Sequence, residues 1–441
     1  MHGFAKNYPM SFYPRWVEHI INILKQVARR WILALLLATL LMGLTAEGPP
    51  PASISTRARY LLAEDQFNFV GWELEALLSK LAYTLVVPQR YMDAPTRHDF
   101  LLEYLTLVSD AQRLEGEIYR VYADPEIEDA AAATVEQRAR LAEMRADEDV
   151  RQPFAEAILE EQVACLLVDE GFGALGQEIP PVRARFTPLP LLLVISPRDH
   201  IEKIFSLGLR AGLGATRREA IESEIEAQFD VSALVTGIGG MAAYPSMLLE
   251  SSSLNWLTNV TAHEWTHHYL TPRPLGWNYN ASPEARTINE TVASIMGEEI
   301  GRKVIARYYP ELLPPEPVPE ELEEEPLTPE PPAFDFQSEM RETRVRVDEL
   351  LAQGKIEEAE SYMEDRRRKF VAHGYHIRKL NQAYFAFHGA YAEKPGAAGE
   401  DPIGPAVQEL RARNSDLNVF VTEIAQVTTL VELQALLEET E

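Results

Sequence analysis

Two histidines that stand four positions apart, His263 and His267, constrain this chain more than any other feature, because Glu264 directly follows the first of them. An α-helix turns once every 3.6 residues or about 100° per residue, so side chains at i and i+4 lie on one face. On a helix the two imidazoles can therefore reach one metal ion. Apolar residues at helical spacing surround the motif and two prolines follow it, which predicts a buried helix from about Asn255 to Tyr269.

A catalytic zinc site takes three protein ligands and leaves one position for water, so a third ligand must come from elsewhere in the chain. The segment Thr287–Ile300 has the apolar pattern of a second helix. On this helix Glu290, Ala293 and Gly297 share one face, and the small residues allow the close helix approach that a short Glu–metal bond requires. We therefore predict that Glu290 joins the two histidines as the third zinc ligand. The competing carboxylates are Glu284, Glu298 and Glu299.

Glu264 is predicted to be catalytic and not a ligand. In this arrangement the Glu takes a proton from the attacking water, whose pKa the metal lowers to about 7. A structural zinc site has no use for such a carboxylate and closes its fourth position with another ligand. The motif thus favours a metal-dependent hydrolase.

The two motifs together resemble the gluzincins, the thermolysin-like branch of zinc metallopeptidases, in which a Glu on a helix completes the site. The stretch Asn289-Glu290-Thr291-x-Ala293 is most similar to a group of bacterial proteins described as predicted aminopeptidases, and Lys379–Tyr384 is a weaker echo of that group. The resemblance covers about residues 185 to 440 and is specific only at the metal motifs. It implies a zincin-like fold, one zinc ion per chain and an aminopeptidase activity. Thermolysin has an Asp near the ligand Glu that orients a histidine, whereas Ala293-Ser294 stand here, so the resemblance leaves that partner unassigned.

Residues 375–391 suggest donors for the oxyanion that develops when water attacks a carbonyl. Four residues of this segment fall at helical spacing on one face: Asn381, Tyr384, His388 and Tyr391. We predict Tyr384 and His388 as the donors. The competing interpretation is that these aromatic side chains pack a helical core.

Gly237, Gly239 and Gly240 follow a short apolar stretch. A phosphate-binding loop would need a helix directly after the glycines, whereas Pro245 and another apolar run follow here, so the sequence does not favour a nucleotide site. Two interpretations remain. Either the glycines shape a turn beside a sheet edge that holds a peptide in extended form, or they form a plain hairpin turn.

Composition limits the class of protein. The chain has 441 residues, 46% of them apolar, and a formal net charge of −27, which argues against a nucleic-acid surface. Its one cysteine, Cys165, excludes an internal disulfide and lies in an apolar stretch that predicts a core position. We expect a mainly α protein with a small β-sheet (α+β), with strand Leu189–Ser196 and helix Arg217–Phe229 before the metal helix.

Changes in composition along the chain suggest five parts. Residues 1–46 are a basic segment with an apolar helix, 47–180 a helical N-terminal region, 181–309 a zincin-like metal-binding core, 310–335 a disordered acidic insert rich in Pro and Glu, and 336–441 a helical C-terminal part of the catalytic domain. The insert is interpreted as an extended loop or as an acidic lid over the site.

The N-terminus predicts contact with a membrane. Residues 31–46 form an uncharged apolar run, and the basic residues before it predict a cytoplasmic N-terminus with the remainder exported. Leu44 stands where a signal cleavage site usually has a small residue. We therefore expect a single-pass anchor with an extracytoplasmic catalytic domain, and the alternative is a secreted protein with a cleaved signal.

These observations together predict a membrane-anchored zinc metallopeptidase that acts on peptides or proteins. The alternative is a helical envelope protein that binds a partner and carries a structural or vestigial metal site.

Overall fold

The structure is a computed structural model that describes residues 53–86, 91–314, 334–392 and 396–439. The chain divides into two units, residues 1–61 and residues 62–441. In the first unit the described residues form helix α2 (Ile54–Leu61). The expected membrane anchor and most of the expected acidic insert lie outside the described residues. Among the residues that are described, none of the helices combines the length and apolar character needed to cross a membrane.

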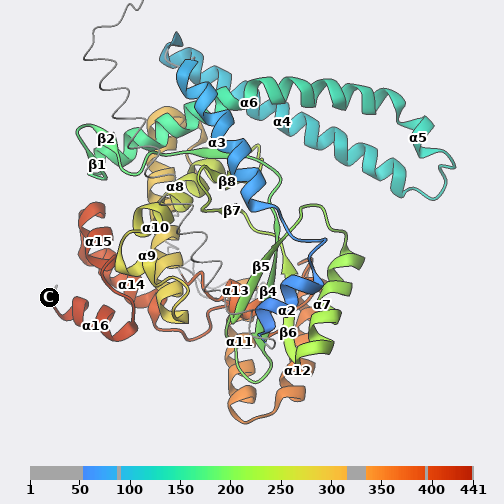
Figure 1. Cartoon of the computed structure of the whole chain (residues 1–441), viewed down its shortest axis with the longest axis vertical. Coiled ribbons are helices and arrows are strands. Elements are labelled where there is room, and N and C mark those ends of the chain that lie inside the picture. Colours follow the sequence, from blue (N-terminus) through green and yellow to red (C-terminus); the bar gives the residue numbers. More distant parts are fainter. Residues whose placement is uncertain (1–52, 87–90, 315–333, 393–395, 440–441) are drawn as a thin grey trace, which may run out of the picture. The chain divides into compact units, whose positions relative to one another are not determined.

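The second unit begins with helices, as expected from the sequence. They are α3 (Phe69–Val86), α4 (Ala94–Ala123), α5 (Ala130–Ala133) and α6 (Val135–Asp169). Helices α4 and α6 run alongside each other as a long hairpin with α5 at its tip (Figure 1). Buried apolar side chains of both helices, such as Leu101 and Ile158, join the main hydrophobic core of the protein.

Cys165 is exposed on α6, and the prediction of a core position is wrong. The reason is helical geometry. The apolar stretch around it extends over more than one turn, so only some of its residues can face the core. Val163, Leu166 and Leu167 take the buried positions, and Cys165 lies between them on the other side.

Within the described residues, two three-stranded sheets and a short hairpin make up the β-structure. The hairpin pairs β1 (Gly173–Ala174) with β2 (Gln177–Glu178). One sheet has the order β3 (Ala184–Phe186), β8 (Ser246–Leu248), β7 (Gly240–Met241), and the other has the order β5 (Phe205–Leu209), β4 (Leu191–Pro197), β6 (Val231–Thr236). The predicted strand Leu189–Ser196 corresponds to β4, and the predicted helix Arg217–Phe229 corresponds to α7 (Ala215–Phe229).

Helix α6 covers the free edge of β3 with two carboxylates that stand one turn apart. Glu156 accepts a hydrogen bond from the backbone N–H of Phe186 at 2.8 Å, and Glu160 accepts one from Ala184 at 2.9 Å. The ammonium group of Lys80 lies 2.6 and 2.7 Å from these two carboxylates. An exposed strand edge is a site of unwanted pairing, and here side chains occupy its N–H groups.

Helix α7 covers the edge of β6 in the same way. Glu222 accepts from the N–H of Val235 at 2.6 Å, and Glu226 accepts from Ala233 at 3.0 Å. The balancing cations are Arg378, which pairs with Glu222, and Lys379, which pairs with Glu226. Edge β7, in contrast, has no pairing partner on its outer side among the described residues.

The remaining helices follow the sheets. They are α8 (Leu254–Leu270), α9 (Pro274–Trp277), α10 (Pro283–Tyr308), α11 (Phe336–Ala352), α12 (Ile356–Ala372), α13 (Gln382–His388), α14 (Ile403–Arg413), α15 (Leu417–Ile424) and α16 (Leu430–Glu439), with a short 3-10 turn at Pro310–Leu312. The expectation of a mainly helical α+β protein is confirmed.

Candidate metal centre

Helix α8 carries the two histidines. It begins after Ser253, whose side chain accepts a hydrogen bond from the N–H of Trp256 and so satisfies one of the open donors of the first turn. Its buried hydroxyl groups donate to carbonyls of the same helix one turn earlier, as Thr261 does to Leu257. A helix with such internally bonded threonines can be buried on several sides. The backbone that carries His263 and His267 is therefore rigid and largely buried.

Helix α10 approaches α8 closely because glycines face it. A Cβ atom at Gly297 would lie 2.8 Å from the carbonyl oxygen of Asn259, and one at Gly301 would lie 2.9 Å from the backbone nitrogen of the same residue. Real Cβ atoms do not come so near to backbone atoms, so any larger residue would push the helices apart. The expected role of small residues beside Glu290 is therefore seen at Gly297 and is extended by Gly301.

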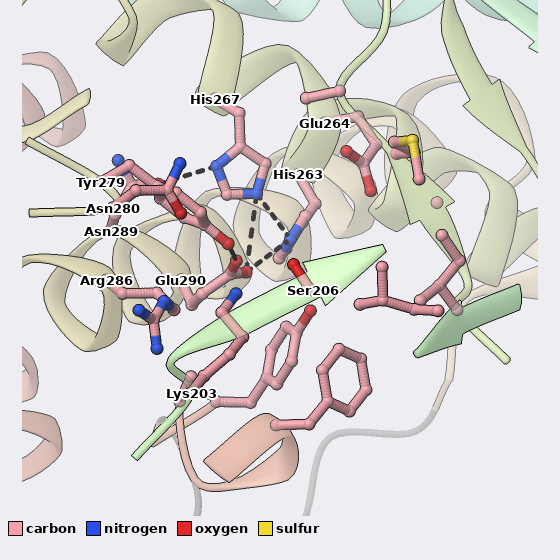
Figure 2. Close-up of a pocket in the computed structure, with 18 of the residues that line it drawn as sticks. Lys203, Ser206, His263, Glu264, His267, Tyr279, Asn280, Arg286, Asn289 and Glu290 are labelled. Atoms are coloured by element: carbon pink, nitrogen blue, oxygen red, sulfur yellow. Dashed lines mark hydrogen bonds and ion pairs between the residues drawn. The ribbon is translucent and has the colours of Figure 1, made fainter. Parts of the chain in front are cut away.

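The three predicted ligands meet at one point (Figure 2). Nε2 of His263 and Nε2 of His267 are 3.2 Å apart, and Oε2 of Glu290 lies 3.5 Å from the first and 3.6 Å from the second. A tetrahedral zinc site with bonds of about 2.0–2.1 Å separates its ligand atoms by roughly 3.3–3.4 Å. Oε2 of Glu290 is also buried without a hydrogen-bond partner. The three groups fit a metal ion and could hold one.

Two neighbours orient these ligands. Nδ1 of His267 lies 2.7 Å from Oδ1 of Asn289, which makes this nitrogen the donor and leaves Nε2 as the free acceptor that a metal needs. The hydroxyl of Tyr279 donates to Oε1 of Glu290, which leaves Oε2 for the metal. Asn289 thus fills the place of the histidine partner that the resemblance left unassigned. Tyr279 lies in the loop between α9 and α10 and carried no signal in the sequence.

The charges of the ligands depend on one another. Burial disfavours ionisation of Glu290, but the two imidazoles outweigh it and hold the pKa of this carboxyl well below its usual range. Burial lowers and Glu290 raises the pKa of His267, with a net value of about 9. The lowered pKa of Glu290 favours the carboxylate form that a metal ligand requires.

Glu264 is buried and lies in the same cavity without being one of the converging ligands. Burial is the largest cause that raises the pKa of its carboxyl, and the neighbouring imidazoles oppose it. Strand β7 passes directly beside it, because a Cβ atom at Gly240 would overlap Oε1 of Glu264 and lie 2.8 Å from Cδ. Only glycine fits at this position without displacing the carboxylate.

The metal ligands lie in a cavity of about 460 Å³. Strand β7 and the residue after it line one side with Gly240, Met241 and Ala242. The other lining side chains include Leu192, Lys203, Ser206, Tyr279, Arg286, Phe387 and Tyr391. The cavity is therefore built from α8, α10, both sheets and the segment around α13.

Two cationic side chains share this cavity. Arg286, on the first turns of α10, is 6% exposed, and its Nε has no hydrogen-bond partner. Burial is the main cause that lowers its pKa below the usual value. Lys203 precedes β5, and burial followed by the charge of Arg286 lowers its pKa to about 8. Neither residue was predicted from the sequence.

Tyr384 and His388 do not line the cavity. They pack against each other, with ring centroids 4.2 Å apart, and Tyr384 contacts two hydrophobic clusters. Burial raises the pKa of Tyr384 to about 12 and lowers that of His388 to about 4. The geometry favours the packing interpretation for both. Tyr391 does line the cavity, and its ring lies 6.3 Å from that of His263.

The four residues do not share one helical face because the helix is shorter than their spacing requires. The sequence placed Asn381 and Tyr391 on one helical face with Tyr384 and His388. However, α13 begins only after Asn381, whose side chain caps it by accepting from the N–H of Tyr384. It ends at His388, before Gly389. Tyr391 therefore lies beyond the helix, and of the four residues expected on one face only Tyr384 and His388 share it.

The competing carboxylates have other partners. Glu284 accepts a hydrogen bond from the N–H of Leu430, Glu299 pairs with Arg411, and Glu298 is exposed. Glu290 is thus the carboxylate of α10 that reaches the histidines. Comparisons of this chain with models of protein families, with curated proteins and with solved structures found no match.

Proposed function

We propose that this chain is a zinc-dependent hydrolase of peptide bonds. The observation that carries the proposal is the convergence of His263, His267 and Glu290 in a cavity where Glu264 lies beside them without joining the ligand set. This combination supports a catalytic site, because a structural zinc site would use a fourth protein ligand. The resemblance of the two motifs to gluzincins supports the same reaction class.

Each side chain of the site would have a separate task. A bound zinc ion would polarise the substrate carbonyl and lower the pKa of water to about 7. Glu264 would take the proton from the attacking water and give it to the departing nitrogen. Asn289 would keep His267 in the tautomer with a free Nε2, and Tyr279 would hold Glu290 so that Oε2 faces the histidines.

The unpaired edge of β7 would hold the substrate. Gly240 and Met241 line the cavity and pair with β8 on one side only. An extended peptide can add to such an edge through backbone hydrogen bonds, which do not demand a particular sequence. This supports the interpretation of the glycine segment as a substrate edge. A strand edge of this kind also suits a peptide substrate better than a small ester or a phosphate.

The proposal is tested by metal content and by peptide cleavage in the same preparations of the full chain. We expect about one zinc per chain in the wild type and none in His263→Ala. The variant Glu264→Gln should retain zinc and lose cleavage of a mixed peptide library by a factor of about 100 or more. Equal cleavage by wild type and Glu264→Gln would contradict the enzymatic role, and absence of zinc from the wild type would leave the binding-protein alternative.

A further inference from the structure

The charges that line the cavity do not balance. Only two of the described lining residues are acidic, Glu264 and Glu290. Apart from the two histidines, which would bind the metal as neutral imidazoles, two are basic, Lys203 and Arg286. A divalent metal ion would be balanced by the two carboxylates. Two positive charges would then remain in a largely buried space, and an unpaired buried charge is costly.

Arg286 is an exception among the buried cations of this protein. The chain has 68 acidic and 41 basic residues. Among the described residues the other buried arginine, Arg366, has Glu339 as its carboxylate partner. The partly buried Arg411 has Glu299. Arg286 is buried, yet within the described part of the chain no carboxylate lies within 4 Å of it, and its Nε is without a hydrogen-bond partner. In such an acidic protein, this leaves a fork of donors available for an anion.

Lys203 adds a second positive charge to the same side of the cavity. Its ammonium lies 5.5 Å from the ring centroid of Tyr279, and no described carboxylate is within ion-pair distance of it. Figure 2 shows Lys203 and Arg286 on the Glu290 side of the ligand cluster, with Glu264 on the opposite side. A substrate bound across the metal site would thus present one end to these two cations.

We propose that Lys203 and Arg286 form a subsite for a substrate carboxylate, which is either the free C-terminus or an acidic side chain next to the cleaved bond. The inference rests on the proposed function and specifies its substrate class. An aminopeptidase needs a carboxylate to pair with the free amine of its substrate, and the described lining offers none beyond the two that the reaction uses. The aminopeptidase activity implied by the resemblance is therefore not the one that this cavity favours.

Binding without cleavage tests the subsite separately from the reaction. The zinc-loaded Glu264→Gln form of the full chain would be titrated with two peptide pairs by calorimetry. The first pair is acetylated penta-alanine with a free C-terminal carboxylate or a C-terminal amide. The second pair is the amidated peptide with Glu or Gln as its last residue. We expect the charged member of at least one pair to bind about tenfold more tightly than its neutral partner, and the pair that discriminates identifies the source of the carboxylate.

Variants in the same background connect the preference to the two cations. Lys203→Gln and Arg286→Gln should each reduce the discrimination severalfold, and Lys203→Gln covers the case in which the buried arginine is needed for folding. Arg273→Gln is the matched control, because Arg273 carries a positive charge near the end of α8 without lining the cavity. Equal affinity within both pairs, including no binding by any peptide, would overturn the subsite. So would discrimination that survives in Lys203→Gln. A third outcome separates the two proposals: the zinc-loaded Glu264→Gln form prefers the charged peptides, but the zinc-loaded wild type cleaves no peptide. This result would refute the proposed peptidase and leave the carboxylate subsite standing.

Discussion

Gly240 determines how closely strand β7 can pass the carboxylate of Glu264. Its missing side chain leaves room for Oε1. The position thus joins two functions, since the same residue that admits Glu264 also belongs to the edge that would hold substrate. A single methyl group here would displace the proton acceptor without touching a metal ligand.

We therefore expect Gly240→Ala to lower kcat by about 100-fold, because a displacement of about 1 Å at a reacting group can cost that much. Zinc content should stay at the wild-type level. Gly237→Ala is the control, since a Cβ atom at Gly237 would have no neighbour within 4 Å. Steady-state kinetics and metal analysis on the three proteins check this prediction, and full activity of Gly240→Ala would contradict it.

Tyr391 is the tyrosine of the segment after α13 that faces the metal ligands. If it stabilises the oxyanion, Tyr391→Phe should lower kcat by about 100-fold with little change in KM or zinc content, because one lost donor costs about 100- to 1,000-fold. Tyr384→Phe is the matched comparison and should keep near wild-type activity. The reverse ranking of the two variants would restore the assignment made from the sequence.

At the scale of elements, helices α6 and α7 use one device to close sheet edges. Each supplies two glutamates one turn apart that accept hydrogen bonds from alternate N–H groups of an edge strand, and each pair of carboxylates has a cation from another segment. Alternate residues of a strand present their N–H groups to the same side, and one helical turn has nearly the same length as two strand residues. This match explains why i and i+4 carboxylates suit an edge.

The cation of the first pair should matter for stability. Lys80→Met would leave Glu156 buried without its counter-charge and Glu160 with only Arg183 at 3.5 Å. We expect this to lower the free energy of unfolding by about 3–5 kcal/mol. Denaturant unfolding of the full chain measures it. Arg113→Met is the comparison, because Arg113 pairs with Asp110 and Glu117 on the exposed face of α4 and should contribute little. Equal stability of the two variants would show that the hydrogen bonds from β3 are enough to stabilise the two buried glutamates.

At the scale of the whole molecule, the candidate metal site connects parts that are distant in the sequence. Helix α8 supplies two ligands and α10 the third, while the loops around α9 and β5 contribute Tyr279 and Lys203 to the same cavity. A bound ion would therefore hold the second unit together as well as support the reaction. Its removal should reduce stability in addition to activity.

We expect a chelator to lower the Tm of the full chain and added zinc to restore it. The gain from binding is about 4 kcal/mol when free zinc is about 1,000-fold above its Kd. His263→Ala should have a lower Tm that neither chelator nor zinc changes. Differential scanning calorimetry of both proteins at fixed concentration checks this, and a Tm of the wild type that is indifferent to chelator would argue against metal binding in the native state.

The sequence predicted the features that depend on local periodicity. His263, Glu264 and His267 belong to one helix, so their relative directions follow from the helical repeat alone. Glu290 could be predicted as the third ligand because its helix also has the small residues that a close helix contact requires. The strand β4 and helix α7 carry clear apolar patterns, and the structure has them at nearly the expected bounds.

The failures come from elements whose ends or partners depend on tertiary contacts. Asn381 stands at helical spacing from the residues that follow it, yet it does not belong to the helix. Its side chain caps α13 and also donates to the carbonyl of Ala233 on β6. This contact with the sheet fixes where the helix begins, so Asn381 caps α13 and does not share the face of Tyr384 and His388. Cys165 was misplaced for a related reason, since an apolar run does not say which side of its helix will be covered.

The sequence alone therefore determined which side chains can meet as a candidate metal group, because side chains on regular helices are positioned by the short-range geometry of the backbone. The tertiary structure decided the surroundings of that group: Asn289 and Tyr279 as supports, Gly240 beside the carboxylate, and Lys203 with Arg286 opposite it. These residues come from different elements and share no period. Only the packing of the helices against the sheets brings them into one cavity, because long-range contacts, unlike a helical repeat, depend on the whole chain at once.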